Sequence, residues 1–171
     1  VGIVRTAMEA RALPAPIRRL HTSSPATRRR ATLSGLRTKA GPLVGFHTRA
    51  SDTVVAIPDC RVLHPALMAS IPAAEALTGL GASRKGQIRV GVLITESGLD
   101  VTVEDARPVD PALWTKIIAV AEAHDLARVA WNGEILAERR LPIVRFGSVA
   151  VTPPSGAFLQ ATAEGEAALR A

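Results

Sequence analysis

The feature that most constrains the fold is a pair of adjacent runs in which apolar and polar side chains alternate. Residues 87–97, QIRVGVLITES, are followed directly by residues 98–106, GLDVTVEDA. In the second run, Val101 and Val103 alternate with polar neighbours, and this period of two is typical of a β-strand. The two runs therefore predict an antiparallel hairpin whose turn lies around Gly98.

Other segments predict further strands of the same kind. Residues 30–37, 42–49 and 53–57 are strand-like and are separated by connections short enough for an antiparallel meander. The dipeptide Asn132-Gly133 is a strong signal for a hairpin between its flanking apolar runs. We also expect one strand over residues 143–151.

Helical apolar patterns occur in four places. Pro72 lies inside the stretch of residues 64–78 and should kink or split that helix. In the helix that starts at Pro111, Trp114 falls on the apolar stripe, so we expect it in the core. Together with the strands, these patterns predict an α+β fold, a mostly antiparallel sheet of hairpins with three or four packed helices. The four stretches are residues 3–12, residues 64–78, a helix that starts at Pro111, and residues 161–171.

Composition and length indicate one globular domain. The chain has 171 residues, of which 47% are hydrophobic, and it contains no run of eighteen apolar residues and no secretory signal pattern. We therefore expect a soluble, cytoplasmic protein without membrane contact. Because the chain begins with valine and ends on an uncapped helical pattern, we expect a piece of a longer protein. Its oligomeric state is left open.

Positive charge is concentrated at the start of the chain. Residues 1–50 carry ten Lys or Arg and a single acid, Glu9, although the formal net charge of the whole chain is only +6. Such asymmetry favours a polyanionic partner, most simply nucleic acid. A solvated face or a flexible basic arm remains an alternative. The candidate phosphate contacts are Arg28, Arg29, Arg30, Arg37, Lys39 and Arg49.

No complete catalytic motif is present. The segment TGLGASRKGQ at residues 78–87 has neither the spacing of a phosphate-binding loop nor the helix that must follow one. The four histidines lack the i, i+4 spacing of a helical metal pair, and no G-x-S-x-G occurs. The only cysteine, Cys60, excludes an internal disulfide and cannot form a zinc site with His64 alone.

Two segments carry a family resemblance. Residues 45–67, GFHTRASDTVVAIPDCRVLHPAL, and residues 153–171, PPSGAFLQATAEGEAALRA, together resemble the uracil-5 RNA methyltransferases. These are S-adenosylmethionine-dependent enzymes that make 5-methyluridine in ribosomal or transfer RNA. Departures from the family pattern are Ala56, where an acid is common, and Thr162, where asparagine is common. The matching residues are Gly45, Phe46, Ser51, Val54, Ile57, Cys60, Phe158 and Gln160.

The resemblance implies that the whole chain is the central domain of such an enzyme. The domain that binds S-adenosylmethionine and the catalytic residues would lie outside the chain, so we expect the fragment alone to be inactive. Within residues 1–171 the expected parts are a basic helix and connector (1–29), a strand meander (30–57), helices and hairpins (64–151) and a link to the methyltransferase domain (153–171).

Three residues acquire roles from the resemblance. Cys60 would be one ligand of a four-iron four-sulfur cluster, in those members that carry one; alternatively it is a small, buried apolar residue. Gln160 would contact S-adenosylmethionine, or else make a helix-cap contact. Phe158 would stack on an RNA base, or else pack against the last helix.

The sequence therefore favours the central domain of an RNA (uracil-5-)-methyltransferase that helps to bind RNA. Two other functions remain open: a non-catalytic nucleic-acid-binding module that shares the strand pattern, and a structural interaction domain. Phosphate contacts carry no sequence information, so the choice between ribosomal and transfer RNA is open too.

Overall fold

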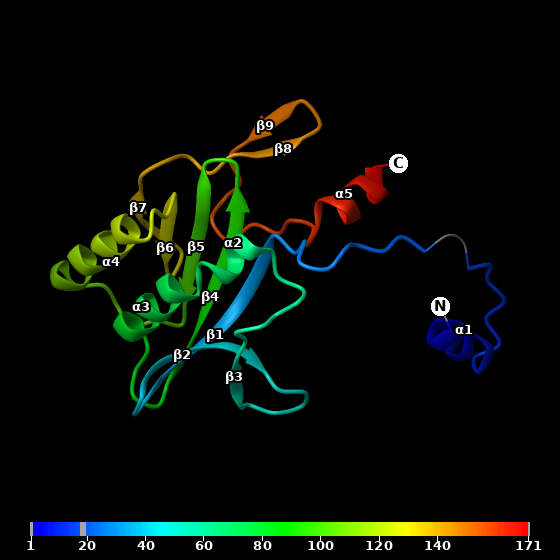
Figure 1. The fold of residues 1–171 in the computed structure, drawn as a ribbon, viewed down its shortest axis with the longest axis horizontal. Coiled ribbons are helices and arrows are strands. Elements are labelled where there is room, and N and C mark those ends of the chain that lie inside the picture. Colours follow the sequence, from blue (N-terminus) through cyan, green and yellow to red (C-terminus); the bar gives the residue numbers. More distant parts are fainter. Residues whose placement is uncertain (1, 18–19, 171) are drawn as a thin grey trace.

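A seven-stranded sheet forms the body of the protein, as the computed structural model of residues 2–17 and 20–170 shows (Figure 1). The strand order is β3-β2-β1-β4-β5-β6-β7, and all neighbours are antiparallel except the parallel pair β5 and β6. The strands are β1 (Arg30–Thr38), β2 (Gly41–His47), β3 (Val54–Ala56), β4 (Gln87–Thr95), β5 (Gly98–Glu104), β6 (Arg128–Trp131) and β7 (Glu134–Glu138); β8 (Val144–Phe146) and β9 (Val149–Val151) form a separate hairpin.

Helices cover one face of this sheet. The helices are α1 (Gly2–Glu9), α2 (Pro65–Met68), α3 (Ile71–Gly81), α4 (Pro111–Ala123) and α5 (Ala163–Arg170). Of these, α2, α3 and α4 lie against the sheet, while α1 and α5 lie away from its covered face (Figure 1). The α+β architecture with a mostly antiparallel sheet is as the sequence predicts.

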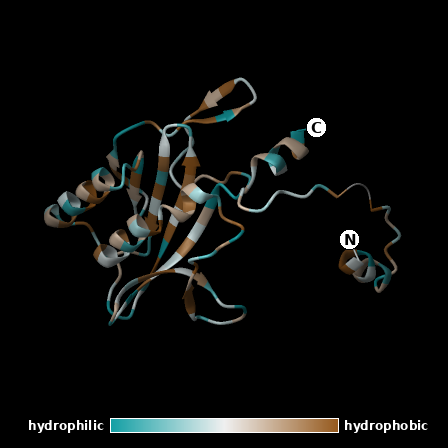
Figure 2. Cartoon of the chain, viewed as in Figure 1, coloured by the Kyte–Doolittle hydropathy of each residue, from teal (hydrophilic) through white to brown (hydrophobic). Residues whose placement is uncertain are grey.

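The core lies between the sheet and these three helices. Alternate side chains of β1, β4 and β5 point into it, among them Leu33, Val90 and Val103. They meet Leu77 of α3 and Ile117 of α4, which are fully buried. Figure 2 shows hydrophobic residues interrupted by more polar ones along these central strands. Each such side chain contributes about 1.5–3 kcal/mol to folding through its burial.

The helix expected over residues 64–78 is split in two. His64 caps α2, with its Nδ1 accepting from the backbone N–H of Ala66 at 3.1 Å. Ser70 then separates α2 from α3, and Pro72 occupies the first turn of α3, where its missing N–H costs no hydrogen bond. The break comes just before the proline, as its chemistry requires.

Two expectations from the sequence are wrong. Trp114 lies on α4 but is 49% exposed, because its indole Nε1 donates to the carbonyl of Leu136 at 2.9 Å at the edge of the sheet. Residues 143–151 form the β8–β9 hairpin and not one strand. Gly147 occupies its turn with φ of 65°, a left-handed conformation that glycine adopts without strain.

The start of the chain stands apart from the sheet. The expected helix of residues 3–12 is observed as α1, and none of its described side chains is buried. Arg18 and Arg19 of the basic connector lie outside the described residues. Within residues 2–17 and 20–170, no helix is long and apolar enough to cross a membrane.

Candidate nucleic-acid interface

Among the described residues no helix covers the second face of the sheet (Figure 1), which carries mostly polar side chains at its centre. The registers of β1 with β4 and of β4 with β5 bring Thr32, Gly91 and Thr102 together across three strands. Residues 153–158 cross this face, and a groove of about 320 Å³ lies between them and the strands. Its walls include Arg30, Thr32, Arg89, Thr102, Gly156 and Ala157.

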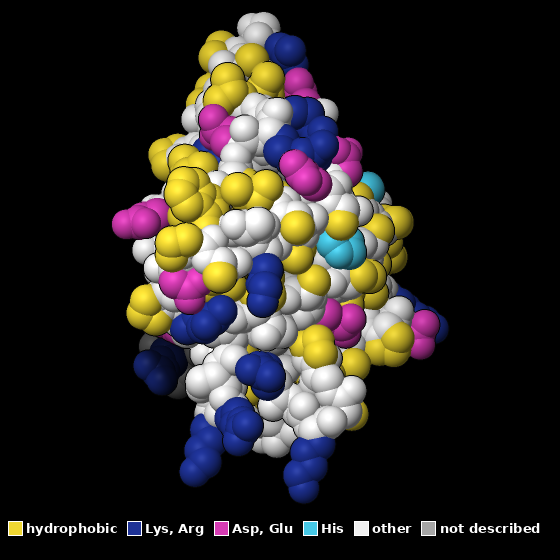
Figure 3. Space-filling model, turned by 90° about the vertical axis from the view of Figure 1, so that its left-hand side faces the viewer, with side chains coloured by type: hydrophobic (Ala, Val, Ile, Leu, Met, Phe, Trp, Pro, Cys, Tyr) yellow, Lys and Arg dark blue, Asp and Glu magenta, His cyan; other side chains and the backbone are white. Residues whose placement is uncertain are grey.

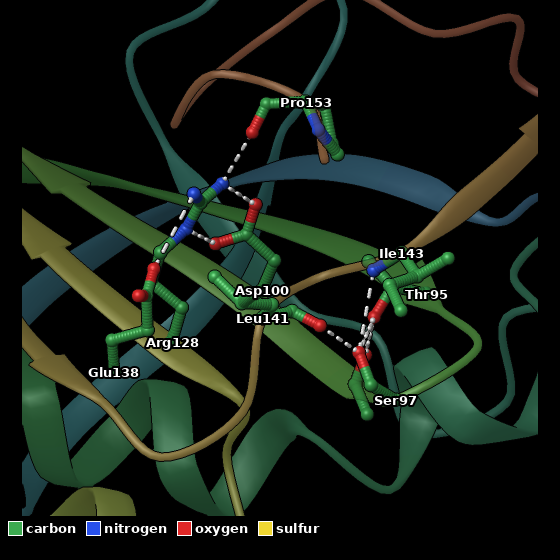
Figure 4. Close-up of polar contacts among 9 residues, drawn as sticks. Thr95, Ser97, Asp100, Arg128, Glu138, Leu141, Ile143 and Pro153 are labelled. Atoms are coloured by element: carbon green, nitrogen blue, oxygen red, sulfur yellow. Dashed lines mark hydrogen bonds and ion pairs between the residues drawn. The ribbon is translucent and has the colours of Figure 1, made fainter. Parts of the chain in front are cut away.

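A buried ion pair fixes the segment that covers the groove. The guanidinium of Arg128 donates to both carboxylate oxygens of Asp100, at 2.9 and 2.7 Å, and also to the carbonyl of Pro153 at 2.9 Å (Figure 4). Both charged side chains are at most 3% exposed. The pKa of Arg128 is raised, because Asp100 accepts hydrogen bonds from its charged form and this outweighs burial.

The loop after β7 is held to the turn between β4 and β5 by a second set of hydrogen bonds. Ser97 Oγ donates to the carbonyl of Leu141 at 2.5 Å and accepts from the backbone N–H of Ile143 at 3.3 Å (Figure 4). Together with the Arg128 contacts, these bonds place the chain that leads to residues 153–158.

An exposed aromatic ring stands beside the groove. Phe158 is 73% exposed, and the guanidinium carbon of Arg30 lies 5.1 Å from its ring centroid. Leu159, the next residue, is buried with Leu93 and Val144, so the backbone on one side of the ring is anchored. The alternative in which Phe158 packs against the last helix does not fit its exposure. An aromatic ring with an arginine beside it is the arrangement on which nucleic-acid bases stack.

The three consecutive arginines lie in different environments. Arg28 is exposed, and its backbone pairs with the chain at residues 62–64. The half-buried Arg29 forms an ion pair with Glu166 of α5. Arg30 lies over Phe158. Arg28 and Arg30 line a common groove, while the ion pair with Glu166 sets Arg29 apart from them.

A second group of basic residues lies at the far end of the sheet. Arg37 and Lys39 belong to the β1–β2 turn and its approach, and Arg84 and Lys85 lie in the loop before β4. The register of Leu36 opposite Gln87 brings these two loops together. Figure 3 shows Lys and Arg side chains gathered at the lower end of the molecule. All four are exposed, and among the described residues none of them has an ion-pair partner.

Sequence reasoning missed Arg84 and Lys85 as members of this group. The available signal was the absence of any acid in residues 76–95 and 31–51, the two stretches that meet at this end. Arg49 is exposed in the loop between β2 and β3, beyond the end of β2.

Cys60 has no partners for a metal site among the residues that the structure describes. It is a free, half-buried thiol that packs against the main core. His64 is occupied as the cap of α2, and within the described residues no group of three or more His, Cys, Asp or Glu is placed to hold a metal ion. One thiolate of the four that a cluster requires is present, so these residues alone do not fit one.

Gln160 is half-buried between β9 and α5. The backbone carbonyl of Gln160 accepts from Arg29 Nε at 3.2 Å. Among the described residues, the side-chain amide of Gln160 has no hydrogen-bond partner. The helix-cap alternative is wrong, because Thr162 caps α5 by accepting from the backbone N–H of Gly165 at 3.0 Å. One free amide does not make a nucleoside pocket, so these residues alone do not fit S-adenosylmethionine.

Comparison with known proteins finds relatives of this chain by sequence, although no family model matches it. It is 36% identical over 168 residues to a protein of Agrobacterium fabrum named as an uncharacterized RNA methyltransferase, a match covering 98% of the chain and 40% of that relative. The chain is a relative of proteins named as RNA methyltransferases.

Other relatives bear the same name. One from Mesorhizobium japonicum is 36% identical over 146 residues, covering 85% of the chain and 35% of the relative. One from Caulobacter vibrioides is 30% identical over 173 residues, covering 97% of the chain and 42% of the relative. The chain thus spans about two fifths of the length of the curated relatives it matches.

Proposed function

We propose that this chain is the RNA-holding central part of an S-adenosylmethionine-dependent RNA (uracil-5-)-methyltransferase. The observation that carries the proposal is the exposed ring of Phe158 under the Arg30 guanidinium, beside the groove on the open face of the sheet. The relatives support the RNA methyltransferase part of the proposal, and the sequence resemblance supports the uracil-5 part.

The residues of the chain would act on the RNA and not on the methyl group. An enzyme that modifies a base must take it out of its stack, and Phe158 offers a ring for an unstacked base. Arg30 adds a positive charge beside that base. The remaining basic residues would bind phosphates and so position the RNA without reading its sequence. These are Arg28, Arg37, Lys39 and Arg49, together with Arg84 and Lys85.

S-adenosylmethionine would supply the methyl group, and Gln160 would contribute its free amide to that cofactor at the edge of the site. Cys60 would complete a four-iron four-sulfur cluster only with thiolates from outside this chain. The RNA would be ribosomal or transfer RNA in the cytoplasm, and the chain alone would be inactive.

The test is RNA binding by the chain, measured by fluorescence anisotropy with a single-stranded, uridine-containing oligonucleotide over a series of salt concentrations. Phe158→Ala should weaken binding roughly tenfold, as expected for losing one stacked base, and should leave the salt dependence unchanged. Arg28→Gln, which removes one proposed phosphate contact, should reduce the slope of log affinity against log salt by about 0.7.

Two control variants match these substitutions. Phe146 of the β8–β9 hairpin is also an exposed phenylalanine, and Lys116 is an exposed cation on α4, which covers the opposite face of the sheet. Phe146→Ala and Lys116→Gln should bind RNA like the unaltered chain. Equal effects of Phe158→Ala and Phe146→Ala would contradict the proposed interface, and no RNA binding at all would favour a structural interaction domain.

A further inference from the structure

Arg29 differs from its two arginine neighbours in what its side chain contacts. Its guanidinium donates through Nη2 to the carboxylate of Glu166 and through Nε to the backbone carbonyl of Gln160, the latter at 3.2 Å. Its backbone N–H donates to the carbonyl of Ala161 at 2.8 Å. The Arg29 side chain is 19% exposed and that of Glu166 is 10% exposed. A phosphate could bind this guanidinium only by displacing partners that already satisfy it.

The contacts of Arg29 belong to a larger set that ties residues 23–29 to residues 160–166. Ser23 and Thr162 share a hydrogen bond between their hydroxyls at 2.7 Å. The backbone N–H and the hydroxyl of Ser24 donate to the carboxylate of Glu164 at 3.0 and 2.9 Å. These two bonds lower the pKa of Glu164. We call the two paired stretches the terminal clasp.

The terminal clasp adjoins the residues that would meet RNA and cofactor. Phe158 is two residues before Gln160, and the residue between them, Leu159, is buried. Arg29 therefore adds a second restraint on the backbone, at Gln160, while Arg30, its neighbour along the chain, lies over the ring of Phe158. Loosening the terminal clasp would free the ring from its place beside the groove.

We propose that Arg29 is a positioning residue for RNA binding and not a phosphate contact: it holds the Gln160–Glu166 segment so that Phe158 is presented beside Arg30. This inference rests on the proposed function. It separates the three arginines into Arg28, which is free for phosphate, Arg29, which positions, and Arg30, which contacts the base.

The test compares Arg29→Gln, Arg29→Lys and Glu166→Gln in the RNA-binding assay. Arg29→Gln should weaken binding by up to about tenfold, the loss expected for one stacked base, with an unchanged salt slope. Glu166→Gln should also weaken RNA binding, although the loss of a negative charge would by itself strengthen binding to a polyanion. Arg29→Lys should rescue only part of the loss, because an ammonium lacks the planar fork that reaches Glu166 and Gln160 together.

A double-mutant cycle with Phe158→Ala shows whether Arg29 acts through the ring. If it does, Arg29→Gln should have no further effect on RNA affinity in the Phe158→Ala background. A purely structural role would instead raise hydrogen exchange in residues 157–166 without changing RNA affinity. Positioning predicts that both change, with the increase in exchange confined to that segment.

The inference fails if Arg29→Gln lowers the salt slope by about 0.7, as Arg28→Gln should, or if Arg29→Lys restores full affinity. It also fails if the losses from Arg29→Gln and Phe158→Ala simply add. If the unaltered chain binds no RNA, the proposed function itself is wrong. If the chain binds RNA and the salt slope changes when the charge of Arg29 is removed, only the inference about Arg29 is wrong.

Discussion

Removing Asp100 should destabilise the fold strongly, because it leaves the Arg128 guanidinium buried without its main partner. Breaking a buried ion pair from one side typically costs about 3–5 kcal/mol. Here Arg128 would keep the carbonyl of Pro153 at 2.9 Å and the carboxylate of Glu138 at 3.9 Å. We therefore expect Asp100→Ala to fall at the lower end, about 3 kcal/mol. That is a large part of the 5–15 kcal/mol that stabilises ordinary domains.

The assay is thermal unfolding followed by circular dichroism, with urea unfolding as a second measure. For a chain of this size the loss corresponds to a fall in Tm of roughly 6–12 °C. The control is the double variant Asp100→Leu with Arg128→Met, which removes both charges and should recover most of the stability. A change below about 1 kcal/mol for Asp100→Ala, the range of an exposed pair, would refute this reasoning.

Two more predictions concern charge and close packing. The pKa of Asp125 is lowered from 3.8 to about 2, chiefly by a hydrogen bond from Arg140, so its carboxylate stabilises the fold above pH 4 and loses that effect as the pH falls toward 2. The difference in Tm between the unaltered chain and Asp125→Asn should therefore shrink over that interval, and a constant difference would contradict it. Gly45→Ala would place a Cβ 1.8 Å from the carbonyl oxygen of Val55, so β2 and β3 must separate at a cost of roughly 1–3 kcal/mol in urea unfolding. Gly79→Ala is the matched control, since its Cβ meets only an ordinary contact at 3.9 Å, and equal effects of the two would count against the close approach.

The strands could be predicted because each leaves a local pattern. The hairpin of β4 and β5 follows from alternation, and the turn at Asn132-Gly133 follows from residues that tolerate positive φ, observed at 49° and 89°. Trp114 could not be placed by periodicity alone. Its indole N–H needs an acceptor, and the carbonyl of Leu136 supplies one at the sheet edge.

The site depends on contacts between distant residues, which a single sequence does not reveal. Asp100 and Arg128 meet only because β6 returns parallel to β5 after α4, and each alone resembles an ordinary polar strand residue. Arg30 and Phe158 were both candidates, but their contact required the fold. The sequence presented Arg28, Arg29 and Arg30 as one basic run, and their different surroundings depend on the terminal clasp.

The most direct test of the account is methyl transfer by the longer protein of which we propose this chain to be the central part. Labelled S-adenosylmethionine would be supplied with ribosomal and transfer RNA, and the RNA would be digested and its nucleosides separated. The account predicts label in 5-methyluridine, strongly reduced by Phe158→Ala and unaffected by Phe146→Ala. Label in another nucleoside, or no transfer to either RNA, would contradict the proposed uracil-5 activity.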